Sequence, residues 1–176
     1  MTNREQLLAD LTMALGKYDM LAFDEAYPHE LGDPCNPDQL AQLERAVGTR
    51  LPPSLRGFLT LHNGWSNFAG DAKILAVEDH GSEWVRDRLD DLATLFAEED
   101  ENPFDAGAVP VMLGVKARGF LLIDPRTVRA DGEMDFIDYD LTREVHRFTD
   151  FDAFLRHKLA ILCRLIDKEM HGAPDE

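Results

Sequence analysis

The sequence has few of the features that mark secreted, membrane or nucleotide-binding proteins. It holds two cysteines, Cys35 and Cys163, in no metal-type spacing, so we expect reduced thiols in a cytoplasm, with a disulfide as the minor alternative. No apolar run approaches the roughly 20 residues of a membrane span, and the charged N-terminus is not typical of a signal peptide. These absences predict a cytoplasmic protein without a membrane role.

Basic residues are scarce, which narrows the class of partner. The chain has 34 Asp and Glu against 18 Lys and Arg, a formal net charge of −16. Such a charge repels phosphate backbones and anionic lipids, so we expect neither a nucleic-acid nor a membrane partner. It favours a cationic protein partner, because long-range attraction speeds encounter. The alternative is that the acidity serves solubility alone.

Motifs for cofactors and catalysis are missing as well. No GxGxxG or GxxxxGK loop occurs, no GxSxG elbow occurs, and the six histidines form no HxH or HExxH pattern. We therefore expect no catalytic residue, no cofactor and no metal ion. One local cluster, Glu78, Asp79, His80 and Glu83, has residue types that could hold a divalent cation. Acids are also favoured at the start of a helix, and we interpret the cluster as a solvated helix entry.

The order of elements predicts the fold class. Helical spacing or capping signals indicate helices over 4–18, from Asn36-Pro37, from Pro53, around Trp84 and from about Asp150. Strand patterns cover 73–77, 109–115, 120–124, 134–139 and 144–148. Helices first, then strands, then a helix is typical of an α+β domain. We expect a mainly antiparallel sheet of about five to six strands with helices packed against it.

Breaks in these patterns suggest how the chain is organised. Residues 1–35 are expected to be an N-terminal helix and an irregular segment packed on the domain. Residues 36–170 form the predicted α+β domain, and 171–176 form a polar tail. A monomer is favoured.

The acids are unevenly distributed. Most lie between 78 and 105, and a second group follows between 131 and 140. Asp87, Asp90 and Asp91 share one predicted helix face, where like charges cost a few tenths of a kcal/mol each. A binding role would explain them, and a plain solvated face is the alternative. The candidate partner-binding residues are Glu78, Asp79, Glu83, Trp84, Asp87, Asp90, Asp91, Asp131, Glu133 and Asp135. Of the two tryptophans, Trp65 is expected in the core and Trp84 at an interface or in the core.

The segment from Leu40 to Val77 carries a family pattern. The pieces are Leu43-Glu44, Val47-Gly48, Leu51-Pro52, residues 55–59, and Asn63-Gly64-Trp65, followed by a strand. Together with later pieces they resemble the SUKH superfamily over about 36–166. That superfamily includes the yeast cell-wall-assembly regulator and many bacterial immunity proteins.

The resemblance implies an α+β domain that binds and neutralises a toxin, without catalytic residues or a cofactor. The first hypothesis is an immunity protein for a cognate, cationic toxin domain of the basic nuclease type. The second is a housekeeping regulatory module with a non-toxic protein partner. The third is a metal-binding or hydrolytic protein that uses the acidic cluster near Glu78.

Overall fold

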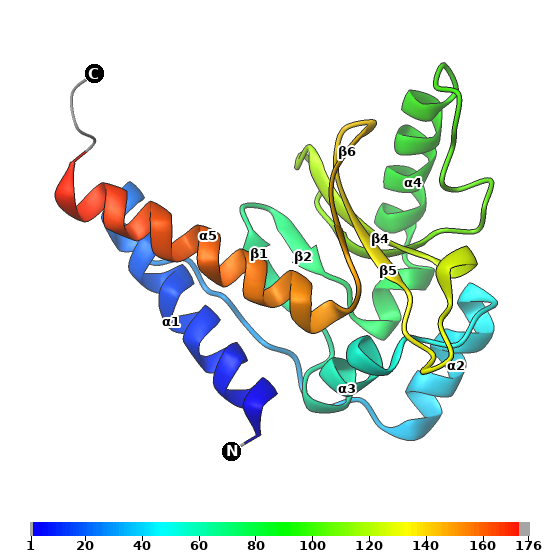
Figure 1. Ribbon diagram of the computed structural model, residues 1–176, viewed down its shortest axis with the longest axis horizontal. Coiled ribbons are helices and arrows are strands. Elements are labelled where there is room, and N and C mark those ends of the chain that lie inside the picture. Colours follow the sequence, from blue (N-terminus) through cyan, green and yellow to red (C-terminus); the bar gives the residue numbers. More distant parts are fainter. Residues whose placement is uncertain (1, 173–176) are drawn as a thin grey trace. The chain divides into compact units, whose positions relative to one another are not determined.

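The computed structural model describes residues 2–172 and contains the predicted helices and strands in their predicted order, together with one strand that was not predicted (Figure 1). The α-helices are α1 Asn3–Phe23, α2 Pro37–Val47, α3 Pro53–Leu61, α4 Glu83–Phe96 and α5 Phe151–His171, with short 3-10 helices η1 Val77–Gly81 and η2 Pro125–Thr127. The strands are β1 Trp65–Ala69, β2 Ala72–Ile74, β3 Val109–Leu113, β4 Gly119–Asp124, β5 Asp135–Asp140 and β6 Arg143–Phe148.

The strands form a six-stranded sheet in the order β1-β2-β3-β4-β5-β6, and each strand runs antiparallel to its neighbour. This confirms the predicted α+β class with an antiparallel sheet. The longest regular register joins β4 to β5, from Gly119 opposite Asp140 to Asp124 opposite Asp135. Strand β1 was not among the predicted strands. It pairs with β2 and also forms an isolated bridge to Leu31, which covers its outer edge.

Local capping explains where two helices begin. Asn36 accepts a hydrogen bond from the Gln39 backbone amide, and the Gln39 side chain accepts one from the Asn36 amide, both at 2.9 Å. This reciprocal pair satisfies two amides that a helix start leaves without partners. Thr2 and Glu5 form the same motif at α1, so this helix begins slightly earlier than predicted. It also continues to Phe23, beyond the predicted end at residue 18.

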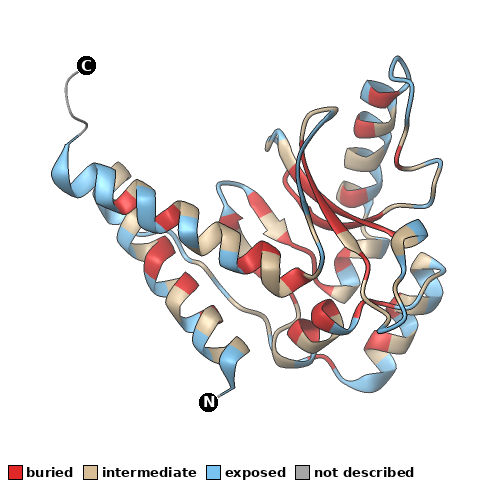
Figure 2. Ribbon diagram, in the orientation of Figure 1, coloured by how far each residue is buried: buried red, intermediate tan, exposed pale blue. Residues whose placement is uncertain are grey.

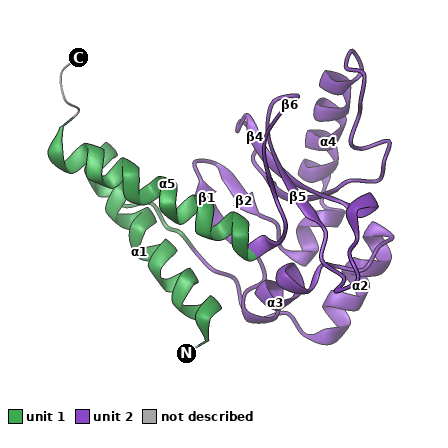
Figure 3. Ribbon diagram, viewed as in Figure 1, with its two compact units in different colours: residues 1–29, 152–176 green, residues 30–151 purple. Residues whose placement is uncertain are grey.

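The chain divides into two compact units, which Figure 3 shows in different colours. The first comprises residues 1–29 and 152–176, of which 2–29 and 152–172 are described. In this unit Arg4 donates two hydrogen bonds to Asp152, at 2.8 and 2.7 Å. His29 and Asp19 lie 2.7 Å apart through Nε2 and Oδ2 and are both largely buried. Of the predicted polar tail, residues 173–176 lie outside the described residues.

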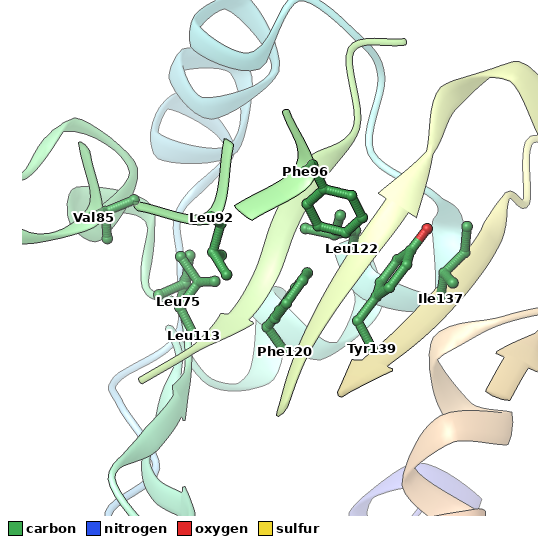
Figure 4. Close-up of a cluster of buried hydrophobic side chains, with 9 residues drawn as sticks. All are labelled: Leu75, Val85, Leu92, Phe96, Leu113, Phe120, Leu122, Ile137 and Tyr139. Carbon is green, nitrogen blue, oxygen red and sulfur yellow. The ribbon is translucent and has the colours of Figure 1, made fainter. Parts of the chain in front are cut away.

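The second unit, residues 30–151, contains the sheet, and helix α4 covers one of its faces. Figure 4 shows the side chains of this core, in which Leu92 and Phe96 of the helix meet Phe120 and Tyr139 of the sheet. The rings of Phe120 and Tyr139 stack with centroids 5.2 Å apart, and Phe96 meets Tyr139 edge-on at 5.6 Å. These contacts fix α4 against the centre of the sheet.

Aromatic side chains also cover the opposite face of the sheet. Phe136 alternates with its β5 neighbour Ile137, which faces α4, so Phe136 points the other way. Its ring lies 5.5 Å from that of Phe151, which in turn lies 5.2 Å from Phe58 of α3. Trp65 is 1% exposed, which confirms the expected core position.

The turn into β1 depends on Gly64. Its φ is +86°, and a Cβ there would lie 2.9 Å from both the Ala76 nitrogen and the Ile74 oxygen. Gly70, in the β1–β2 turn, also has positive φ (+61°), but a Cβ added at this residue would have no neighbouring atom within 4 Å. A residue with a Cβ at position 64 would therefore have both an unfavourable φ and a clash with backbone atoms, whereas at position 70 it would have the unfavourable φ alone.

We expect Gly64→Ala to lower the free energy of unfolding clearly more than Gly70→Ala. The φ penalty alone costs about 1 kcal/mol, and the clash should add about 1–3 kcal/mol at Gly64. Urea denaturation followed by circular dichroism measures both variants. Equal losses would show that the close approach at Gly64 does not matter.

Candidate functional site

Helix α4 has two contrasting faces. Ser82 caps its start by accepting a hydrogen bond from the Val85 amide at 3.4 Å. Val85, Leu92 and Phe96 recur at helical spacing and are buried on the side of the sheet. Trp84 and Leu89 flank this stripe and are partly buried against the same cluster, whereas most of the other positions are exposed, as the pale blue parts of this helix in Figure 2 show. The apolar stripe thus determines which face of α4 is left open.

Four acids lie on the open face and form what we call the α4 acidic surface: Glu83, Asp87, Asp90 and Asp91. All four are exposed, and within residues 2–172 none of them takes part in an ion pair. The segment after the helix adds further exposed acids, namely Glu98, Glu99, Asp100, Glu101 and Asp105. The result is a stretch of chain, from Glu83 to Asp105, in which only Arg86 and Arg88 offset the acids and the net charge is clearly negative.

Trp84 lies at the margin of this surface and is partly buried. One side of it packs against the core cluster beneath α4. The Lys73 ammonium lies 5.7 Å from its ring centroid, within the range of a cation–π contact. Trp84 is therefore held in place by the fold and still partly open to a partner.

Asp79 lies in η1, just before α4, and does not present a free carboxylate. It is 8% exposed and accepts hydrogen bonds from the Ala76 amide at 2.7 Å and from Lys73 Nζ at 2.9 Å. Its role is to fix the chain that enters α4, so it does not belong to the α4 acidic surface. Its neighbour Glu78 is exposed and accepts one hydrogen bond from Asn63, at 2.8 Å.

Glu133, in the second acidic group, supports the fold. Both of its oxygens accept hydrogen bonds from Ser54, from the amide at 2.7 Å and from the hydroxyl at 2.8 Å. Helix α3 starts at Pro53 and has no side-chain cap of its own, so Glu133 supplies one from a distant part of the chain. Asp131 is exposed, and its carboxylate accepts from the Glu133 amide at 3.0 Å.

Asp135 is neutralised by two arginines, Arg129 at 2.7 Å and Arg147 at 3.3 Å. The neighbouring Asp124 is buried, and its hydrogen bond with Arg126 lowers the pKa of its carboxyl group. The hydrogen bond from Arg147 to Glu144 raises the pKa of the Arg147 guanidinium. This corner of the sheet has mixed charge, and Glu133 and Asp135 do not extend the α4 acidic surface.

The side chains of the cluster Glu78, Asp79, His80 and Glu83 do not come together in a way that could bind a metal ion. Within residues 2–172, no group of three or more His, Cys, Asp or Glu side chains is placed to hold a metal ion. His80 is mostly buried, and this burial lowers its pKa to about 4, so the ring is neutral near pH 7. Helices long and apolar enough to cross a membrane are absent from the same residues.

Comparison with known protein families identifies the family of this chain. The profile of the SMI1 / KNR4 family (SUKH-1) matches residues 34–157, well over half of the chain. The chain belongs to this family. A search of the curated proteins found no match.

The SUKH-1 match confirms the resemblance found in the sequence and places the candidate residues within the family fold. The matched range runs from just before α2 into α5 and includes η1, α4 and the whole sheet. Helix α1 lies outside it. SUKH proteins are known for toxin immunity and are generally interaction modules without catalysis.

We expect Glu133→Ala to lower the free energy of unfolding by about 1–3 kcal/mol, because it leaves the Ser54 amide and hydroxyl without their shared acceptor. Asp87→Asn, which removes an equal charge from an exposed and unpaired site, is the control and should change stability by less than about 0.5 kcal/mol. Urea titration measures both. Matching effects would mean that Glu133 does not act as the cap of α3.

The buried, neutral His80 predicts a pH dependence of stability. Its folded pKa is about 4, below the ordinary 6.5, so the unfolded chain binds this proton more readily. The stability that the neutral ring contributes is full above pH 6.5 and is lost as pH falls towards 4. Stability of the wild-type chain should fall more steeply than that of His80→Asn between these limits, measured by thermal melts at matched ionic strength. Parallel pH profiles would contradict the assignment.

Proposed function

We propose that this chain is an immunity protein that binds and neutralises a cationic toxin domain through the α4 acidic surface. The observation that carries the proposal is the set of exposed carboxylates on Glu83, Asp87, Asp90 and Asp91, which have no ion-pair partner within residues 2–172. Membership of a family known for toxin immunity supports the same conclusion.

The charges suit recognition of a basic protein surface. Unpaired carboxylates on one helix face give a local negative potential, which steers a cationic partner and raises its rate of association. Like charges at this spacing slightly weaken the helix, so they are unfavourable unless a partner neutralises them. Trp84, at the margin of the surface, supplies the partly open aromatic side chain that interface centres favour. A standard interface would bury roughly 800 Å² on each partner.

Neutralisation by this route needs no chemistry from the chain. A protein that covers a basic active surface of a toxin excludes the toxin's substrate by occupancy alone. The carboxylates of Asp79, Glu133 and Asp135 are engaged inside the fold, and of these three only Asp79 lies next to α4, where it fixes the segment that enters the helix.

The direct test is the triple variant Asp87→Asn, Asp90→Asn, Asp91→Asn. We expect at least a 100-fold loss of affinity for a cognate toxin domain, a slower association rate, and a weaker dependence on salt. Surface plasmon resonance at two salt concentrations measures all three. Thermal stability should stay equal or rise slightly, because like-charge repulsion in α4 is removed.

A matched control removes three exposed acids elsewhere: Asp38→Asn, Asp167→Asn and Glu169→Gln. This variant has the same net charge as the triple variant and should keep wild-type affinity within a few-fold. Equal losses in both variants would show that net charge, and not the α4 acidic surface, governs binding.

Growth rescue on co-expression with the toxin distinguishes immunity from a housekeeping role, for which the partner would not be toxic.

A further inference from the structure

A small hollow lies beside the edge of the sheet, in residues 30–151, close to the start of α4. It has a volume of about 200 Å³ and lies between β1, the segment before α2, and η1. Small-molecule sites usually span roughly 300–1,000 Å³, so this hollow is small for a metabolite or cofactor. Its size suits one long side chain from another protein.

Two glycines leave the hollow open. Gly32 and Gly64 both line it, and the Gly32 amide donates to the Gly64 carbonyl at 3.1 Å. A Cβ at Gly32 would lie 2.2 Å from the Asn63 oxygen, so neither position accepts a larger residue. Close backbone packing therefore fixes these two positions of the lining as glycine.

Negative charge surrounds the hollow from two directions. Glu30 comes from the segment that pairs with β1, and Glu78 comes from η1. Both are exposed, the Glu30 carboxylate has no partner in the described part of the chain, and Glu78 uses only Oε2 to accept from Asn63. Ser66 adds a hydroxyl that is likewise without a hydrogen bond there. Residues with free acceptor atoms thus border a space that the fold does not fill.

One cation also lines the hollow, but its charge is already balanced. Lys73 Nζ lies 2.9 and 2.8 Å from the two oxygens of Asp79. The remaining charge around the space is that of Glu30 and Glu78. Trp65 pairs with Ile74, the strand neighbour of Lys73, so its indole points to the face of the sheet opposite Lys73. Trp65 is nevertheless among the residues that line the hollow, and its buried indole N–H has no hydrogen-bond partner within residues 2–172.

We propose that this hollow receives an arginine side chain of the partner protein. A guanidinium has five N–H groups spread in a plane, so it can donate to several acceptors at once, and the acceptors of Glu30, Glu78 and Ser66 all border this space. Arginine is also enriched among the residues that anchor interfaces by filling pockets. The inference deepens the proposed function and depends on it for the identity of the partner, although the hollow should bind the side chain alone.

The test uses a probe that does not depend on the toxin. N-acetyl-arginine-N-methylamide is titrated into the ¹⁵N-labelled protein, with the citrulline analogue as its neutral isostere. We expect saturable amide shifts at Gly32, Gly64 and Ser66 with a Kd in the millimolar range, and at least tenfold weaker binding of the citrulline compound. Equal binding of both probes, or shifts spread evenly along α4, would overturn the inference.

Three variants distinguish binding in the hollow from a general effect of the acidic charge. Glu30→Gln with Glu78→Gln should weaken arginine binding at least tenfold, whereas Asp167→Asn with Glu169→Gln, which removes the same charge from α5, should leave it within twofold. Ser66→Phe should block the probe without any change of charge, because its ring fills the space. Arginine binding that survives Ser66→Phe would refute the inference.

The outcomes also separate this inference from the proposed function. If the arginine probe binds the hollow but no toxin binds the chain, the proposed function is wrong and the inference that the hollow receives an arginine side chain is upheld. If a toxin binds through α4 with unchanged affinity in the Glu30→Gln, Glu78→Gln variant, the proposed function is right and the hollow is not its anchor.

Discussion

Strand β4 is buried on both of its faces, and this burial determines what the surrounding elements do. Phe120, Leu121, Leu122 and Ile123 are at most 1% exposed, although successive side chains point in opposite directions. Each face must therefore be covered, one by Leu92 and Phe96 of α4 and the other by aromatic side chains that include Phe136 and Phe151. Because α4 covers the sheet with one apolar face, made of the buried stripe and the flanking Trp84 and Leu89, the positions on its opposite face can carry charge without loss of core packing.

Acidic residues in this chain divide by the partner each one has. Glu133 caps α3 and Asp135 binds two arginines, whereas the acids of α4 are open to water. A carboxylate with an internal partner has little to gain from an external cation, since it must first give up its own hydrogen bonds. Net charge alone does not show which carboxylates have an internal partner, because this depends on distances between residues that lie far apart in the sequence. Exposed acids without an ion-pair partner among residues 2–172 are most concentrated on α4 and the segment after it, while others, such as Asp38 and Asp167, are scattered over the rest of the chain.

The helices and most strands could be predicted from the sequence because their signals are local. Capping at Asn36 and the alternation in β4 and β5 can be read from neighbouring residues. Strand β1 was missed because it is short and has polar residues at its centre, and its edge is paired by Leu31 far upstream. The open face of α4 could be predicted from helical spacing. The role of Glu133 could not, since Ser54 lies 79 residues away along the chain.

The α4 acidic surface and the hollow would contribute differently to recognition. An exposed helix face in high dielectric adds little affinity per charge but acts over a distance of about 8–10 Å at physiological salt, so it governs how fast a cationic partner arrives. A confined space flanked by Glu30 and Glu78 acts only at contact, and it admits a side chain of one shape and charge. Gly32 and Gly64 line the hollow, and close backbone neighbours leave no room for a Cβ at either position, so this part of its lining is fixed by the packing along the β1 edge. Substitutions of the α4 acids would therefore change the long-range attraction for a cationic partner without changing the hollow. The hollow would then distinguish between basic partners of similar net charge, because only a side chain of the right shape and charge enters it.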